Sequence, residues 1–279
     1  MNKSLKYKYI NTLPQKIKNK RFDIIKKRLS FKNDIIPKYT LITVVLNNRK
    51  LLEFTIKSII NQKYKNFEYI VIDGGSTDGS LQIIKKYSKY INYWVSEKDL
   101  GLYDAFNKGI RLAKGQYIGI INSDDVYTRD ALKIINNYLS KNKKADFIFG
   151  SVKKHWGILH GFKPKKIKYS WGFYSSHSTG FFIKNTSAKK VGLYDINYKF
   201  HADYDYFYRM IVHKKLKGIA TKKNEIVGIF RRGGYSSKSP YKKMFLEELK
   251  IRYDNGQNLI LIGLIAVYRI FKNLKNFIK

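Results

Sequence analysis

The sequence of 279 residues contains no cysteine, which excludes a disulfide framework and a thiolate metal site. This absence fits a reducing compartment. Acidic residues are also scarce, because 20 Asp and Glu stand against 56 Lys and Arg and leave a formal net charge of +36. The N-terminus lacks the apolar segment of a signal peptide, so we expect none.

Lysine supplies most of the positive charge, with 46 Lys against 10 Arg. A field of this sign favours anionic partners such as nucleic acid, acidic lipid surfaces or phosphorylated small molecules. Proteins that read base sequence depend on arginine forks, which are scarce here, so we expect no nucleic-acid partner. Abundant Lys, Asn, Ile and Tyr is also what an AT-rich genome produces, and part of the charge then carries no function.

Apolar residues make up 44% of the chain and aromatic residues 15%, which argues against wholesale disorder. The length suits one large α/β domain with extensions. Residues 1–38 hold twelve Lys or Arg and two Asp, and they form a predicted basic N-terminal extension with one short helix near Phe22–Leu29.

From residue 39 onward, strand-like and helix-like segments alternate. Strands are predicted at Thr40–Leu46, Phe67–Ile72, Tyr93–Val95, Gln116–Ile121 and Asp146–Phe149. Helices are predicted at Leu51–Asn61, Leu81–Tyr90, Leu102–Ala113 and Ala131–Leu139. This alternation is typical of βαβ units, so we predict the α/β class with a mostly parallel sheet flanked by helices. Right-handed crossovers place the carboxyl ends of such strands at one edge.

After Gly150 the pattern is mixed. The predicted segments are a strand pair over Ser151–His160, strands at Gly180–Ile183 and Glu225–Phe230, and helices at Ala202–Val212 and Lys242–Tyr253. We therefore expect a domain at 39–236, divided near residue 125, and a helical C-terminal segment at 237–279.

The C-terminal segment contains ten residues without charge, Leu259–Tyr268, whereas a membrane-spanning helix needs about 20 apolar residues. Beyond them, Arg269, Lys272 and Lys275 recur on one side of a helix. This pattern predicts a basic amphipathic helix lying at a lipid surface. The alternative is a terminal helix packed on the domain.

The apolar run Tyr117–Asn122 leads through Ser123 to the adjacent carboxylates Asp124 and Asp125. Such a run is typical of a buried parallel strand, and charge is tolerated where the strand leaves the sheet. Neighbouring carboxylates repel unless a cation or a set of donors holds them, and Mg²⁺ prefers oxygen ligands. We predict a cation site here; a solvated turn before the helix at Asp130 is the alternative.

Acidic residues recur where the chain leaves predicted strands. The four clusters are Asp73, Asp99 with Asp104, Asp124 with Asp125, and Asp203 with Asp205. Ligands of open α/β sheets bind at the carboxyl edge of the strands. Because seven of only 20 acids occupy these places, they predict a ligand site at that edge.

Thr43–Asn48 resembles the first strand and loop of family 2 glycosyltransferases with the GT-A fold, and Ile72–Gly79 resembles their second strand and turn. Ser96–Gly109 is similar to a segment of the colanic-acid, O-antigen and capsule branch of that family. Asn122–Asp125 is similar to the family's Asp-x-Asp metal motif. The resemblance spans roughly residues 37–232 and implies a GT-A fold, with the nucleotide-sugar half before residue 126 and the acceptor half after it.

The resemblance also implies which residues bind the donor. They are Thr43, Asn47, Asp73, Gly74, Asp99, Asp104, Lys108, Asp124, Arg231 and Arg232. Asp73 would accept a hydrogen bond from the N–H of a uracil base, with a capping Asx turn as the alternative. Asp104 has a similar alternative as the cap of the next helix. Arg231 and Arg232 would close over the diphosphate as a lid, or belong to a solvated loop.

The metal ligands implied are Asp125, as the direct ligand, and Asp124, which would also approach the ribose. The implied cofactor is Mn²⁺ or Mg²⁺, bridging the two phosphates of the donor. Such a cation stabilises the charge that builds on the leaving diphosphate.

His201–Arg209 resembles the segment that carries the family's catalytic base, and Asp203 aligns best with that base. Ala202 stands where many members carry an acid, which leaves Asp205 as a rival. The acceptor-binding residues expected are His177, Trp171 and Asp205.

Taken together, these features predict an inverting, metal-dependent enzyme that moves a sugar from a nucleotide-diphosphate sugar, most simply a UDP-sugar, to a hydroxyl. The acceptor would be lipid-linked or polysaccharide, in bacterial surface-glycan synthesis such as O-antigen, capsule or exopolysaccharide. The basic ends would hold the protein on the inner, anionic face of the cytoplasmic membrane. Two alternatives are a non-specific nucleic-acid-binding protein and an inactive domain that only binds nucleotide sugar.

Overall fold

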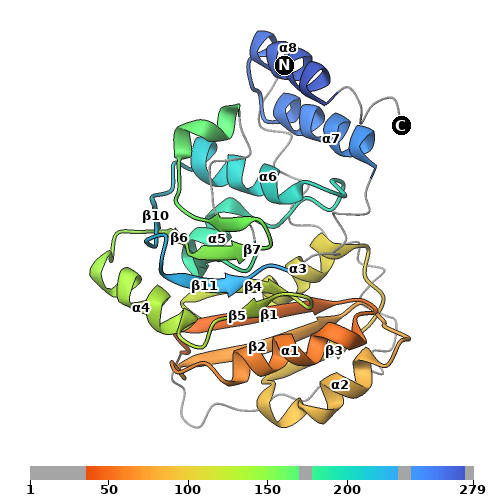
Figure 1. Ribbon diagram of the computed structural model, residues 1–279, viewed down its shortest axis with the longest axis vertical. Coiled ribbons are helices and arrows are strands. Elements are labelled where there is room, and N and C mark those ends of the chain that lie inside the picture. Colours follow the sequence, from red (N-terminus) through yellow and green to blue (C-terminus); the bar gives the residue numbers. More distant parts are fainter. Residues whose placement is uncertain (1–35, 170–177, 232–239, 274–279) are drawn as a thin grey trace.

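The computed structural model describes residues 36–169, 178–231 and 240–273, and Figure 1 traces them. Within these ranges the strands form a seven-stranded and a four-stranded sheet. The expected helix near Phe22–Leu29 and nearly all of the basic N-terminal extension lie outside the described residues.

The seven-stranded sheet carries the core of the domain. In spatial order its strands are β10 (Gly218–Ala220), β6 (Phe147–Phe149), β9 (Phe181–Lys184), β4 (Tyr117–Asn122), β1 (Tyr39–Val45), β2 (Phe67–Asp73) and β3 (Tyr93–Ser96). Four of the six pairings are parallel, and β9 runs antiparallel to both of its neighbours. The prediction of a mostly parallel sheet is confirmed, with one reversed strand.

Helices cover both faces of this sheet because alternate residues of each strand point in opposite directions. Leu41 of β1 packs in a cluster with residues of α1 (Arg49–Ile60), α2 (Ser80–Lys86) and α4 (Ala131–Lys141). Ile42 packs on the other face, with residues of α3 (Leu102–Leu112), α5 (Asn185–Val191) and α6 (Ala202–Tyr208). Apolar spacing in the helices supplies the other half of each cluster, as in α1, where Leu52, Ile56 and Ile59 are buried.

The four-stranded sheet runs β5 (Val126–Tyr127), β11 (Ile226–Ile229), β7 (Ser151–Lys154) and β8 (Gly157–Leu159). The strand pair expected over Ser151–His160 is confirmed as the antiparallel β7–β8 hairpin. Pairing of β11 with β5 returns the chain to the turn that follows β4, next to Asp125.

The C-terminal helices stack on α6, as Figure 1 shows, where α7 (Tyr241–Asp254) lies between α6 and α8 (Leu259–Lys272). The α6 helix continues into a π-helical turn, Arg209–His213. Glu248 of α7 is buried and binds both Arg252, at 2.7 Å, and Arg269 of α8, at 2.6 Å. No helix in the described ranges is long and apolar enough to cross a membrane.

Gly109 tests how closely α3 packs against the sheet, and Gly263 is the comparison at an open helix position. A Cβ at Gly109 of α3 would overlap the side chain of Ile42, whereas a Cβ at Gly263 of α8 would meet nothing within 4 Å. We expect Gly109→Ala to lower the free energy of unfolding by about 1–3 kcal/mol through overpacking. Gly263→Ala should raise it by about 0.5–1 kcal/mol, because alanine favours the helix. Urea unfolding measures both, and an equal effect of the two substitutions would contradict this packing.

Candidate active site

Acidic residues from several strands meet at one edge of the central sheet. Parallel pairing sets Asp73 opposite both Val45 and Ser96, and sets Asn122 opposite Val44. The loops that follow these strands are joined by hydrogen bonds, as between Asn48 Nδ2 and Ser123 Oγ at 3.0 Å. The predicted convergence at the carboxyl edge is confirmed for the clusters after β2, β3 and β4.

Asp73 ends β2 and is fully buried. Its carboxylate accepts hydrogen bonds from the hydroxyl and backbone N–H of Ser76, at 2.5 and 3.1 Å, and from the hydroxyl of Ser96 at 2.5 Å. The structure thus has a turn held by the aspartate side chain, close to the alternative raised from the sequence. Contact of Asp73 with a uracil base stays a prediction.

Asn47 and Thr43 differ in their access to this edge. Asn47 is exposed with φ of 50°, and its side-chain oxygen accepts a hydrogen bond from the backbone of Thr77, which joins the first two loops. Thr43 is fully buried inside β1, and its Oγ1 accepts a hydrogen bond from the hydroxyl of Tyr69. The side chain of Thr43 thus belongs to the core, and its part in donor binding stays a prediction.

Lys108 of α3 organises the cluster after β3. Its ammonium group contacts the carboxylates of Glu97 at 2.9 Å, Asp99 at 2.5 Å and Asp104 at 3.6 Å. Burial raises the pKa of Asp99, and the hydrogen bond from Lys108 opposes this shift. Burial lowers the pKa of Lys108, but the hydrogen bonds to these carboxylates outweigh it and raise the pKa overall. Gly74 is required here, because a Cβ would lie 2.8 Å from Asp99 Oδ2.

Asp104 also accepts a hydrogen bond from the backbone N–H of Leu100 at 3.1 Å, just before α3 begins. This contact matches the capping alternative. Binding of Asp99, Asp104 and Lys108 to a ribose or sugar stays a prediction.

Asp125, like Asp73, has no exposed surface. The hydroxyl of Thr179 donates to its Oδ2 at 2.6 Å, and the backbone N–H of Arg231 donates to its Oδ1 at 3.1 Å. These bonds join the turn after β4 to the start of β9 and the end of β11. Neighbouring Asp124 is half-buried, and no described residue other than itself donates a hydrogen bond to its carboxylate.

Burial raises the pKa of the Asp125 carboxyl to about 7, and repulsion from Asp124 adds to this effect. Burial also raises the pKa of Asp124, against the weaker attraction of Arg231. Arg231 and Lys154 thus compensate the pair only in part, and a divalent cation would add the remaining positive charge. Two donors leave lone pairs of Asp125 free, since a carboxylate offers about four acceptor positions.

The residues present fit such a cation, although the described residues contain no cluster of three or more His, Asp or Glu side chains placed to hold one. Mg²⁺ is commonly held by one or two carboxylates together with substrate phosphates. Arg231 lies beside the pair, with its guanidinium 5.0 Å from the ring centroid of Phe54.

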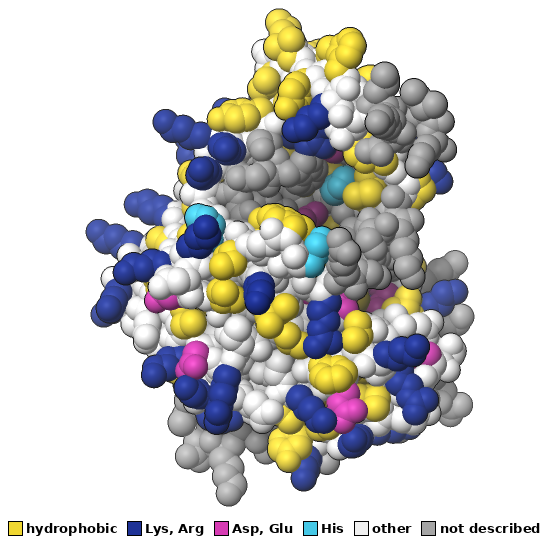
Figure 2. Space-filling view, viewed as in Figure 1, with side chains coloured by type: hydrophobic (Ala, Val, Ile, Leu, Met, Phe, Trp, Pro, Cys, Tyr) yellow, Lys and Arg dark blue, Asp and Glu magenta, His cyan; other side chains and the backbone are white. Residues whose placement is uncertain are grey.

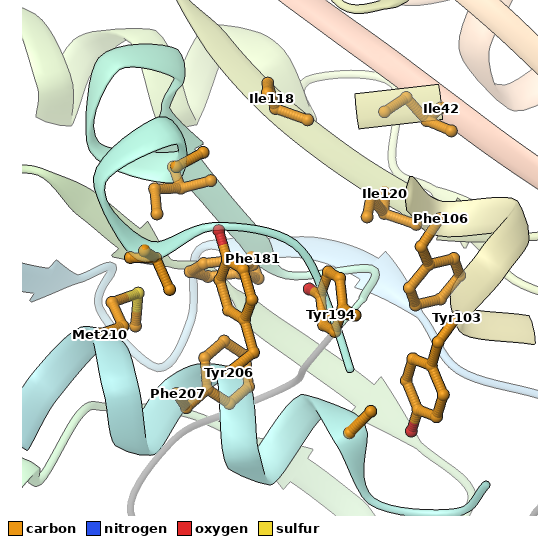
Figure 3. Packing of buried hydrophobic residues seen from close by; sticks show 14 of the residues in the cluster. Ile42, Tyr103, Phe106, Ile118, Ile120, Phe181, Tyr194, Tyr206, Phe207 and Met210 are labelled. Atoms are coloured by element: carbon orange, nitrogen blue, oxygen red, sulfur yellow. The ribbon is translucent and has the colours of Figure 1, made fainter. Parts of the chain in front are cut away.

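Asp203 lies in the first turn of α6 and not at a strand end. Its Oδ1 accepts a hydrogen bond from the hydroxyl of Tyr103 at 3.2 Å, which connects it to the first turn of α3 next to Asp104. Figure 3 shows Tyr103, Tyr194 and Tyr206 between α3 and α6, with stacked centroids 5.7 and 4.3 Å apart. The aromatic stack fixes the helix that carries Asp203.

Asp205 has a different role in the same turn of helix. Arg209 Nε donates to its Oδ2 and Asn255 Nδ2 to its Oδ1, both at 2.9 Å. Both oxygens are thus engaged within the fold, where they join α6 to α7. The assignment of Asp203 as the base and an acceptor contact of Asp205 both stay predictions.

Three supporting residues were not anticipated from the sequence. Thr179 and Tyr103 hold Asp125 and Asp203, as described above. Glu247 of α7 accepts hydrogen bonds from the backbone N–H groups of Lys199, Phe200 and His201, at 2.6 to 2.7 Å, directly before α6. No local pattern identifies these residues, because each partner is more than 45 positions away.

The expected acceptor residues Trp171 and His177, and the second lid residue Arg232, lie outside the described residues. Figure 2 shows the molecule hollowed between the upper helices and the central sheet, with acidic side chains visible in the hollow. The described acidic clusters therefore form one candidate site, connected from Asp125 through the strand-end loops to α3 and Asp203.

A family model, described as glycosyl transferase family 2, matches residues 40–198. The chain belongs to this family. A PGL/p-HBAD biosynthesis glycosyltransferase of Mycobacterium bovis is 25% identical over 235 residues, which cover 81% of this chain and 89% of that protein. An uncharacterized glycosyltransferase of Methanocaldococcus jannaschii is 31% identical over 177 residues, 59% of this chain and 61% of that protein. The family 2 chain described here is accordingly a glycosyltransferase.

Solved structures confirm the GT-A fold. S. aureus TarS superposes with a TM-score of 0.64 and 16% identity, covering 85% of this chain, which spans 44% of the length of TarS. TarS 1–349 in complex with UDP-GlcNAc superposes with a TM-score of 0.62 and 16% identity. The superposition covers 85% of this chain and 73% of TarS 1–349. The mannosyltransferase PcManGT from Pyrobaculum calidifontis, in complex with GDP-Man and Mn²⁺, superposes with a TM-score of 0.58 and 17% identity. The superposition covers 94% of this chain and 75% of PcManGT.

Asparagine substitutions of Asp203 and Asp205 should differ in their effect on stability. Asp205→Asn leaves the buried guanidinium of Arg209 without its counter-charge, so we expect the free energy of unfolding to fall by about 3 kcal/mol. Asp203→Asn can still accept the hydrogen bond from Tyr103 and should cost less than about 1 kcal/mol. Urea unfolding of both variants tests this, and equal losses would remove the distinction.

Proposed function

We propose that this family 2 glycosyltransferase transfers a sugar, with inversion, from a nucleotide-diphosphate sugar to a hydroxyl of a lipid-linked or polysaccharide acceptor. The observation that carries the proposal is the carboxylate pair Asp124 and Asp125 at the sheet edge, together with a separate acid, Asp203, which Tyr103 connects to the start of α3. UDP-GlcNAc in the TarS complex and GDP-Man in PcManGT support a nucleotide-sugar donor. We favour UDP as its nucleotide.

Two kinds of acidic site divide the chemistry. Asp203 takes the proton of the acceptor hydroxyl while the oxygen attacks the anomeric carbon. The bond to the diphosphate breaks on the opposite face, so the configuration inverts. Tyr103 holds the carboxylate of Asp203 through its hydroxyl, and Glu247 fixes the backbone just before it.

Asp125 and Asp124 would hold Mn²⁺ or Mg²⁺. When bound, this cation stabilises the negative charge that develops on the leaving diphosphate. Mn²⁺ in the PcManGT complex supports this choice. Arg231, whose backbone already binds Asp125, is placed to add a second positive charge beside the phosphates.

An acceptor of this class would belong to bacterial surface-glycan synthesis, such as O-antigen, capsule or exopolysaccharide. We propose that it works on the cytoplasmic face of the cytoplasmic membrane, where lipid-linked acceptors are available. The net charge of +36 supports attraction to that anionic leaflet.

Asp203→Asn should lower transfer by about 10²–10⁴-fold, because the acceptor hydroxyl loses its base. Binding of the nucleotide sugar, followed by thermal shift with Mn²⁺, should stay near the wild-type value. Asp130→Asn, which alters a surface carboxylate paired with Lys63, is the matched control and should retain activity. Full turnover by Asp203→Asn, together with loss in folded Asp205→Asn, would reverse the assignment.

Asp125→Asn should abolish the dependence of turnover on Mn²⁺ or Mg²⁺ and the rise in melting temperature that these ions cause. The physical reason is the loss of the charged ligand at the centre of the site. Chelation of the wild-type protein should reproduce the activity loss. Metal-stimulated turnover undiminished in Asp125→Asn would refute the metal assignment.

A further inference from the structure

The outer face of α8 is apolar. Seven of its large side chains are exposed, from 39% for Ile270 to 77% for Phe271; the others are Leu259, Ile260, Leu264, Val267 and Tyr268. At 3.6 residues per turn these positions cover roughly half of the helix surface. Figure 2 shows hydrophobic side chains gathered at the top of the molecule, where Figure 1 places α8.

The inner face of α8 carries one of the helix's two charged residues, Arg269. Ile265 is buried, and Arg269 turns toward α7 to bind Glu248 at 2.6 Å. An ordinary surface helix has the reverse arrangement, with its apolar stripe on the protein and its charges in water. The predicted basic face is therefore corrected: Arg269 is not directed to a lipid surface, because it forms an ion pair within the protein.

The neighbouring helix α7 also exposes two large apolar side chains, Leu246 and Tyr253, at 55% and 65%. Nine of the 17 exposed large hydrophobic residues in the described ranges thus belong to these two adjacent helices. Contiguous exposed apolar surface of this kind marks an interaction site.

We propose that the α7–α8 face binds the interface of an anionic lipid bilayer, with α8 lying parallel to the membrane plane. A 14-residue helix is about 21 Å long, which is too short to span the hydrocarbon core but suits the interface. Tyr268 and Phe271 supply aromatic anchors, and Lys272, whose ammonium lies 3.3 Å from the hydroxyl of Tyr268, extends toward headgroups.

Charge decides between the possible occupants of this face. Each copy of the chain carries a formal charge of +36, so a second copy would be repelled, whereas an anionic leaflet attracts it. Basic side chains within about 10 Å of the surface add this attraction to the burial of the apolar face. An anionic lipid surface would accommodate both the exposed apolar face of α8 and the positive net charge of the protein.

Membrane contact through α8 also orients the site. Asn255 of α7 holds Asp205 of α6, and Glu247 holds the backbone before Asp203. The bilayer would therefore lie on the α6 side of the molecule, away from β1–β3, and a lipid-linked acceptor would enter beside Asp203. This last step rests on the proposed function; the membrane contact does not, and a vesicle assay without substrate measures it separately.

The experiment compares full-length wild-type protein with Leu264→Ser/Phe271→Ser and, as an independent pair, Ile260→Ser/Val267→Ser. Co-sedimentation uses phosphatidylcholine vesicles with about 30% phosphatidylglycerol, and vesicles of phosphatidylcholine alone. We expect each pair to lower the partition coefficient for anionic vesicles by about tenfold or more. Trp156→Ser, which removes a 61% exposed side chain from the β7–β8 turn, is the matched control and should bind like wild type.

Wild-type binding by both double variants would overturn the proposal, as would failure of the wild-type protein to sediment with anionic vesicles. Light scattering of the lipid-free proteins provides the remaining test. A wild-type dimer that both pairs convert to monomer would identify the face as an interface between copies and refute lipid binding. Unchanged melting temperatures, expected because all four positions are exposed, ensure that lost sedimentation reports the surface.

Discussion

The buried carboxylate of Asp125 is the interaction on which the site depends. It lies just beyond β4 and takes hydrogen bonds from Thr179, before β9, and from the backbone of Arg231, after β11. Three chain segments separated by more than 50 residues are thereby fixed at one point. An anion with no exposed surface is costly unless donors or a cation compensate it, so this arrangement couples the stability of the edge to the charge that the site receives.

The first half of the fold follows from local pattern. The strands β1, β2, β3 and β4 are apolar runs separated by helices with regular apolar spacing, and βαβ handedness then sets their carboxyl ends together. Short elements escaped this reasoning. β5 has two residues and β10 three, too few to show a period, and α5 follows β9 without a break. The reversal of β9 is set by its pairing with β4 and β6, which no local residue specifies.

The site was predictable in outline and not in detail. Most of its acids could be located because a charged side chain is not tolerated inside a buried apolar strand and therefore occurs where the strand ends. The partners of each acid could not be predicted, because those of Asp203 and Asp205 lie on α3, on α7 and within α6 itself. The burial of Thr43 could not be foreseen for a related reason: its hydroxyl lies two positions from a strand end, but its partner, Tyr69, lies on the next strand.

Glu248 gives the upper helices a mechanical property. One carboxylate neutralises two guanidinium groups that come from different helices, and its side chain is only 1% exposed. Separating α8 from α7 would break the contact of Arg269 with a buried carboxylate, whereas Arg252 lies on the same helix as Glu248 and would stay paired. The next residue of α7, Glu247, binds the backbone directly before α6. Two consecutive carboxylates of one helix therefore attach both the C-terminal helix and the segment that leads to Asp203.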